Sequence, residues 1–222
     1  MLDLIQEIFN YSTIMRLLGG LWLTLEISFI SIAISILGGL FFGILMSLKK
    51  RYIYFLCRFC LEFVRVMPLI VWLFVVYFGL ARWLGVDINA FMATVIVFSI
   101  WGVFEMMDLV RSALQSIPKH QYESASSLGL SKPNVFIFVI IPQILRRLTP
   151  MSMNLFTRMI KSTTFAYFIG VIELFKVAQQ IIELHRNEIV APFLVFGLVF
   201  FIYFIICYFI TLYSKYLERK WS

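Results

Sequence analysis

The chain has 222 residues, of which 62% are hydrophobic and 14% charged, and its formal net charge is +7. Soluble domains average about 25% charged residues, so this composition indicates an integral membrane protein and excludes soluble enzymes, coiled coils and disordered chains. A transmembrane helix takes about 20 residues, so the length allows about five or six spans and no sizeable soluble domain. The sequence has no phosphate loop, zinc-helix motif or nucleophile turn, so another chain must supply any energy.

Uncharged runs predict five transmembrane helices, and therefore an all-α membrane protein in which residues 1–222 form one membrane domain. In chain order, the predicted spans are residues 27–48, 66–81, 88–104, 149–171 and 189–214. The fourth span carries Arg158 and Lys161, which cost about 2.5 to 3.5 kcal/mol each at a helix centre, so it should face protein or water. Residues 1–18 are acidic and mildly amphipathic, and we expect them to lie on the membrane surface.

Basic residues predict the orientation of these spans. Twelve of them lie in the loops after the first and third spans or after the fifth, against four on the other side. Basic residues gather in the cytoplasm, so the C-terminus should be cytoplasmic and the N-terminus outside. The odd number of spans and the lack of an internal repeat predict a second subunit. No basic aromatic cluster is present, and we therefore expect no nucleic-acid partner.

The segment 111–147 is the least membrane-like part of the chain and is predicted to be a cytoplasmic loop with two short helices. Pro118 can begin the first helix and Gly129 can end it in the left-handed conformation. Ser131 can cap the second helix, where Pro133 loses no hydrogen bond. The first helix would offer a small, partly apolar surface to a partner's groove. The residues of that surface are Tyr122, Ala125, Ser126 and Leu128. A surface helix without a partner would fit the same pattern.

A spaced motif runs through this loop: ESASSLG, then nine residues, then VIIP. Its fixed positions include Glu123, Ser124, Ala125, Gly129 and Pro142. The spacing resembles the EAA loop of ATP-binding-cassette importer permeases, with serine in place of the middle alanine. The resemblance implies that this loop docks on an ATPase subunit, that Glu123 pairs with a basic residue there, and that Gly129 supplies the turn.

The resemblance extends over nearly the whole chain. The segments that carry it are GLWLTLEISFISI, EFVRVMPLIVWLFVVYFGL, RSALQSIPKHQYESA and KSTTFAYFIGVIELFKVAQQI, which are similar to the polar amino-acid subfamily. It implies the type I importer permease fold in a bacterial inner membrane. It also implies a second permease copy or paralogue, two ATPase subunits that bind ATP and magnesium, and an extracytoplasmic amino-acid-binding protein. This chain would then have no catalytic residue, metal or cofactor of its own.

Ionisable and polar groups within the spans are candidates for the substrate path. The candidates are Arg65, Glu105, Asp108, Asn154, Arg158 and Lys161. An amino-acid zwitterion needs a cation for its carboxylate and an acceptor for its ammonium group, and these residues supply both. The alternative is that Arg158 or Lys161 only neutralises Glu105 or Asp108 so that the chain can insert.

Movement of the loop would be coupled mechanically to the fourth span, because the second short helix leads through residues 134–145 into that span.

Several positions depart from the subfamily pattern, namely Val66, Met67, Trp72, Glu105 and Leu155. They leave the cargo open, with glutamine or another polar amino acid favoured, and a non-transporting member of a heteromeric pair is also possible. Two other classes stay open: a proton-coupled carrier that uses Glu105 and Asp108 as relays, and a membrane-embedded enzyme or structural subunit.

Overall fold

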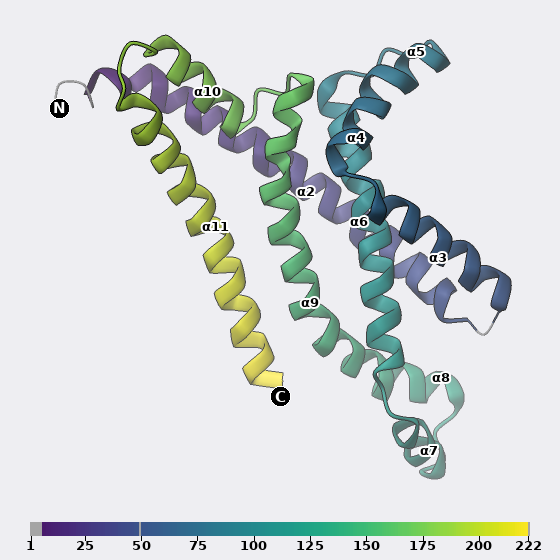
Figure 1. Ribbon diagram of the computed structural model, residues 1–222. Coiled ribbons are helices and arrows are strands. Elements are labelled where there is room, and N and C mark those ends of the chain that lie inside the picture. Colours follow the sequence, from purple (N-terminus) through teal and green to yellow (C-terminus); the bar gives the residue numbers. More distant parts are fainter. Residues whose placement is uncertain (1–5, 49, 222) are drawn as a thin grey trace. The chain divides into compact units, whose positions relative to one another are not determined.

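The computed structural model describes residues 6–48 and 50–221, and these residues form helices and no strand. The α-helices are α2 (Tyr11–Ser47), α3 (Arg51–Val66), α4 (Leu69–Phe74), α5 (Ala81–Leu84), α6 (Ala90–Gln115), α7 (Lys119–Ser127), α8 (Lys132–Asn134), α9 (Ile141–Ser162), α10 (Leu174–Leu184) and α11 (Ala191–Trp221) (Figure 1). Two π-helical segments, η1 (Val75–Leu80) and η2 (Val135–Ile140), and one 3-10 helix, η3 (Thr163–Ile169), connect some of them. The all-α fold class is confirmed.

Within the described residues, four helical stretches are long and apolar enough to cross a membrane: α2, α6, the run from α8 to η3, and α11. A fifth is present if α3 and the segment from α4 to η1 are counted together as one broken span. Four of the five predicted spans are therefore found as helices of sufficient length, and the second is found only as part of this bent pair. The orientation stays a prediction from the charges. Lys49, one of the basic residues in that charge count, lies outside the described residues.

The second span differs from the prediction of one helix over residues 66–81. A helix ends at Val66 instead, and the next begins at Leu69 after a break at Met67 and Pro68. Proline has no backbone N–H and disfavours the helical conformation of the preceding residue, which accounts for the break. Residues 51–65, which were placed between the first two predicted spans, form with Val66 the amphipathic helix α3, whose buried residues Cys57, Leu61 and Val64 share one face.

Helix α2 is longer than a membrane is thick. Its 37 residues extend about 55 Å, against about 30 Å of hydrocarbon. It includes residues 11–18 of the predicted surface segment, which are thus continuous with the first span. Residues 1–5 of that segment lie outside the described residues, and its surface position stays a prediction.

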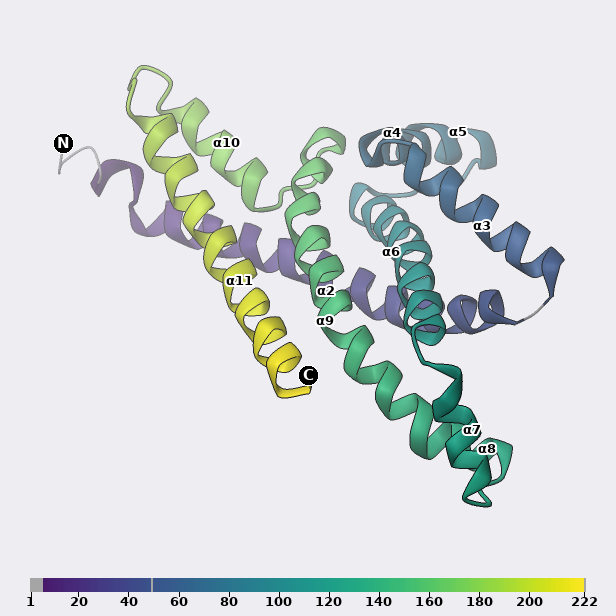
Figure 2. The ribbon, with the colours of Figure 1, turned by 60° about the horizontal axis from the view of Figure 1, so that its bottom comes forward.

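The chain divides into two compact units, and α2, α6, α9 and α11 each contribute to both. The first unit comprises Met1–Ile32, Met67–Ser99 and Arg158–Phe209, and the second comprises Ala33–Val66, Ile100–Thr157 and Ile210–Ser222. In the first unit, α10 lies beside the beginnings of α2 and α11 (Figure 2). Its buried side chains Leu174, Val177 and Ile181 form the core there with residues of both neighbours.

In the second unit, α2 lies against α6 at a row of glycines. A side chain at Gly39 would collide with Met106, and a Cβ at Gly43 would lie 2.9 Å from the Met107 carbonyl oxygen. Small residues at such spacing let two membrane helices approach closely. The glycines therefore fix the distance between these two helices.

We expect Gly43→Leu to lower the stability of the detergent-solubilised protein by about 1 to 3 kcal/mol, because the larger side chain separates α2 from α6. The matched control is Gly19→Leu on the same helix, where an added Cβ has no neighbour within 4 Å. Thermal unfolding of both variants checks the expectation. Equal unfolding temperatures for the two variants would contradict the close packing of α2 and α6.

Candidate functional site

The loop after α6 folds as its glycine and prolines predict. Pro118 precedes the first residue of α7, and Gly129 follows the helix with φ of +81°. The Gly129 N–H donates to the Ser126 carbonyl oxygen at 3.0 Å, and the Leu130 N–H donates to the Ala125 carbonyl oxygen at 3.4 Å. This pair of bonds is the Schellman motif, in which a left-handed residue ends the helix. The left-handed conformation predicted for Gly129 is confirmed.

The second half of the loop runs into the fourth span without interruption. Ser131 precedes α8 as predicted, but its side chain makes no capping hydrogen bond, so that detail was wrong. Helix α8 continues through η2 into α9, which confirms the predicted continuity. Pro142 is the second residue of α9. Its ring would clash with the backbone of an ordinary α-helical turn before it, and the wider π-helical turn of η2 avoids that clash.

Helix α7 buries one face against its own protein. Ala125 is 5% exposed and belongs to a core cluster with Val135 and Ile140, and Tyr122 packs against the same cluster. The partner surface predicted from Tyr122, Ala125, Ser126 and Leu128 is therefore wrong for its first two members. The reason is that the chain after Gly129 folds back and covers them.

The outward surface of the loop includes Glu123, Ser124 and Leu128, which we call the docking face after the ATPase contact predicted for this loop. Leu128 is 83% exposed, which is unusual for a leucine beside a helix end. Figure 1 shows α7 and α8 lying together at the beginning of α9. The docking face thus combines one carboxylate with one exposed aliphatic side chain.

Two hydrogen bonds join the loop to the beginning of α9. Gln143 donates through Nε2 to Gln121 Oε1 at 3.1 Å, and Arg147 donates through Nη1 to the Ser116 carbonyl oxygen at 2.7 Å. The Gln143 bond and the buried Ala125 pack α7 against the following chain and the first turn of α9, and the Arg147 bond ties α9 to the residue after α6. A displacement of α7 would therefore move α9.

A cluster of four charges lies in the second unit, where α3 ends beside α6. Arg65 donates through Nε to Glu105 Oε1 at 2.8 Å and contacts Asp108 Oδ2 through Nη2 at 3.3 Å. Arg111 donates through Nη2 to Asp108 Oδ1 at 2.8 Å. Glu105 and Asp108 are 10% and 20% exposed at the side chain, so two nearly buried carboxylates are matched by two arginines.

The structure therefore brings together three of the predicted path residues, Arg65, Glu105 and Asp108. The sequence left open, as an alternative to substrate contact, that Arg158 or Lys161 neutralises Glu105 or Asp108, whereas the ion pairs found are with Arg65 and Arg111. The role of Arg111 was missed, although its position three residues after Asp108 on one helix face was an available signal. The Arg65 side chain is 39% exposed, so one side of the cluster is open.

Asn154, Arg158 and Lys161 share an exposed face of α9, and Leu155 and Met159 on the opposite face are fully buried. An exposed polar face on a membrane-crossing helix must meet protein or water, because lipid cannot hydrogen-bond to it. The predicted helical spacing of the three residues is thus present. Asn154 belongs to the second unit, and Arg158 and Lys161 belong to the first.

Glu173, in the connection between η3 and α10, was not singled out from the sequence. Its side chain is fully buried and accepts hydrogen bonds from the backbone N–H groups of Phe175 and Lys176, both at 2.8 Å. Tyr203 of α11 donates to Glu173 Oε2 at 3.5 Å. Desolvation outweighs these bonds and raises the pKa of Glu173 from 4.5 to about 7. The carboxyl caps α10 and ties it to α11.

This raised pKa predicts a pH-dependent stability. The folded protein binds the Glu173 proton more tightly than the unfolded chain, so the contribution is fully present below about pH 4.5 and is lost as the pH rises to about 7. We expect a loss of up to about 3 kcal/mol over that range. Thermal unfolding against pH checks it, and Glu173→Gln should remove this slope. An unchanged slope in that variant would contradict the assignment.

Among residues 6–48 and 50–221, no three histidine, cysteine, aspartate or glutamate side chains gather to hold a metal ion.

Residues 35–222 match the family described as "Binding-protein-dependent transport system inner membrane component". The chain belongs to this family. Its members are membrane subunits rather than ATPases, so the protein is a multi-pass permease subunit of the inner membrane, and ATP hydrolysis belongs to a separate chain.

Two curated relatives from Bacillus subtilis (strain 168) are similar over most of their length. The chain is 32% identical over 203 residues to the probable amino-acid ABC transporter permease protein YckA, covering 91% of this chain and 88% of that protein. It is also 32% identical over 201 residues to the probable glutamine ABC transporter permease protein GlnP, covering 90% and 91%. Other relatives are described as L-cystine and arginine transport permeases, so the relatives differ in cargo.

Solved structures share the fold. The chain superposes on a crystal structure of an amino acid ABC transporter with histidines with a TM-score of 0.81 and 26% identity, covering 92% of this chain and 94% of that one. An inward-facing MetNI methionine ABC transporter gives a TM-score of 0.77 at 18% identity, covering 96% and 100%, which shows the fold alone. The predicted importer permease fold is confirmed.

Proposed function

We propose that this permease subunit carries a polar amino acid, with glutamine as the favoured cargo, into the cytoplasm. Two ATPase subunits that bind ATP and magnesium would drive it, a second copy or paralogue would complete the path, and an extracytoplasmic binding protein would deliver the substrate. The similarity to a probable glutamine permease over nine-tenths of the chain supports the cargo. The observation that carries the coupling is the docking face held on a body continuous with α9.

The docking face transmits force in this account. Closure of the two ATPase subunits would displace α7 through Glu123 and Leu128, whose side chains face outward. Because α7 is packed and hydrogen-bonded to the beginning of α9, the displacement would carry that helix with it. A packed body of this kind moves as a unit between two arrangements rather than deforming.

The substrate would pass the polar groups of the spans. The open side of the charge cluster would offer the Arg65 guanidinium to a substrate carboxylate, and the ammonium group would approach the less exposed Glu105 and Asp108 beside it. The exposed face of α9 adds Asn154, Arg158 and Lys161. These residues give both charges that a zwitterion needs.

The test is uptake of labelled glutamine into proteoliposomes that contain the permease, its ATPase and its binding protein. We expect uptake to require ATP, to resist a protonophore, and to be outcompeted by unlabelled glutamine more strongly than by arginine or cystine. Uptake that a protonophore abolishes without ATP dependence would favour the proton-coupled carrier. ATP-driven uptake of arginine or cystine alone would leave the importer assignment intact and overturn the cargo.

A further inference from the structure

A cavity of about 640 Å³ lies in the second unit, where the ends of α6 and α11 meet the early turns of α9. It lies beside the cytoplasmic loop and shares Ser116 and Arg147 with the bond that joins the loop to α9, whereas the charge cluster contributes no residue to it. Its polar lining comprises Ser112, Ser116, Arg146, Arg147, Glu218 and Trp221. Arg146 and Arg147 are both exposed to solvent, so an anion can reach their guanidinium groups from outside.

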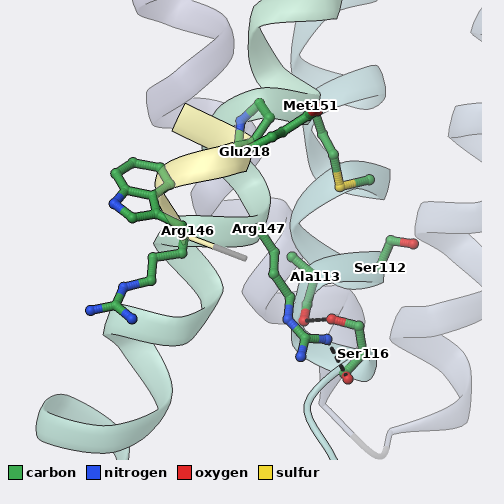
Figure 3. Close-up of a pocket in the computed structure, with 9 residues that line it drawn as sticks. Ser112, Ala113, Ser116, Arg146, Arg147, Met151 and Glu218 are labelled. Carbon is green, nitrogen blue, oxygen red and sulfur yellow. Dashed lines mark hydrogen bonds between the residues drawn. The ribbon is translucent and has the colours of Figure 1, made fainter. Parts of the chain in front are cut away.

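The chain itself holds one of these arginines in place. Arg147 spans from α9 to the end of α6 and donates through Nη1 to the Ser116 carbonyl oxygen at 2.7 Å (Figure 3). Ser116 is fixed in turn, because its hydroxyl donates to the Ala113 carbonyl oxygen at 2.7 Å. A guanidinium has five N–H donors, so this bond orients the group and leaves four N–H donors for another acceptor.

Helix α11, whose end lines the cavity through Glu218 and Trp221, carries residues typical of the depth of the lipid headgroups. The last turns of α11 carry Tyr213 and Tyr216, whose rings stack 6.4 Å apart, and Lys220 Nζ lies 5.9 Å from the Tyr216 ring centre. Aromatic and basic residues at the end of a span are typical of the membrane interface. The charge pattern assigns this end to the cytoplasm, where the leaflet is negatively charged.

The charges of the lining select the ligand. Arg146 and Arg147 against Glu218 leave one net positive charge, which matches the single negative charge of a phosphodiester. The planar guanidinium also fits the oxygens of a phosphate better than an ammonium group does. We propose that this cavity binds a phosphate group, supplied either by the headgroup of an anionic phospholipid such as phosphatidylglycerol or by free phosphate. The site is independent of the cargo.

The experiment uses the permease with its ATPase in phosphatidylcholine nanodiscs. One arm adds spin-labelled phosphatidylglycerol and measures the immobilised fraction, and the other arm adds inorganic phosphate and follows its phosphorus resonance. We expect the double variant Arg146→Gln, Arg147→Gln to weaken binding about tenfold or more. Lys215→Gln, a basic residue of the same helix end outside the cavity, should change it less than about twofold.

Glu218→Gln is the control for misfolding. Removal of this negative charge should strengthen phosphate binding, which a misfolded variant would not do. If phosphatidylglycerol is immobilised and the variants change its binding in this pattern, the lipid is the source of the phosphate group. If inorganic phosphate binds in this pattern and the lipid does not, free phosphate is the ligand. The proposal is overturned if neither probe binds, if the double variant binds normally, or if Lys215→Gln weakens binding as strongly as the double variant.

Discussion

Gly129→Asp is expected to abolish amino-acid uptake while the protein still inserts and assembles. Any residue with a Cβ at φ of +81° pays about 1 to 2 kcal/mol, and the two bonds that end α7 depend on this conformation. Loss of the turn would move Leu128 and Glu123 and so disturb the proposed contact with the ATPase. Parallel measurements of ATP hydrolysis and uptake in proteoliposomes should therefore show hydrolysis without uptake.

Two variants control this prediction. Gly129→Asn should keep most uptake, because asparagine tolerates the left-handed conformation best among the other residues. Gly85→Asp introduces the same strain at another glycine of positive φ, +64°, outside the coupling loop, and should leave uptake coupled. Normal uptake by Gly129→Asp, or equal loss in Gly85→Asp, would contradict the role of the loop.

Arg65→Gln is expected to reduce uptake at least tenfold and to destabilise the protein by about 2 kcal/mol. Loss of an exposed ion pair costs up to about 1 kcal/mol, and breaking a buried pair costs about 3 to 5 kcal/mol. The expected value lies between them because Arg65 is partly exposed and its partners are nearly buried. Glu105 would lose an ion-pair partner, and a substrate carboxylate would lose its cation. Uptake kinetics and thermal unfolding measure the two effects separately.

The matched control is Arg58→Gln on the same helix. Arg58 pairs with Glu62, and both side chains are more than 40% exposed, so its loss should cost less than about 1 kcal/mol and leave uptake unchanged. Arg65→Lys should restore stability more than uptake, because an ammonium group supplies the charge without the fork that contacts two carboxylates. Equal behaviour of Arg58→Gln and Arg65→Gln would contradict the cluster.

The features predicted correctly from the sequence are those set by local composition. Uncharged runs locate the spans, and Gly129 predicts its own turn because no other residue adopts a left-handed conformation so readily. The charge cluster is different in kind. Arg65 lies about 40 residues before its partners, and no periodicity links it to Glu105, so the pairing depends on how α3 folds back along α6.

The errors arose where tertiary packing decides the outcome. Pro68 was visible, but the apolar run on both sides of it masked the break in the second span. The four charges of α3 placed it between two predicted spans, although Cys57, Leu61 and Val64 recur at helical spacing. Ala125 and Tyr122 were assigned to the partner's side because the sequence of a nine-residue helix does not reveal which face the following chain covers. Glu173 has no motif that predicts burial.

The most direct test of coupling is a cross-link between the docking face and the ATPase. In a variant with Cys57, Cys60 and Cys207 replaced by serine, Leu128→Cys would be oxidised with an ATPase carrying a single cysteine at its candidate docking cleft. The account predicts that this cross-link forms, that it stops uptake, and that reduction restores uptake. The control is Arg51→Cys, an exposed position predicted to lie on the same side of the membrane, which should form no cross-link. Uptake at the unmodified rate with the Leu128→Cys cross-link complete would contradict it.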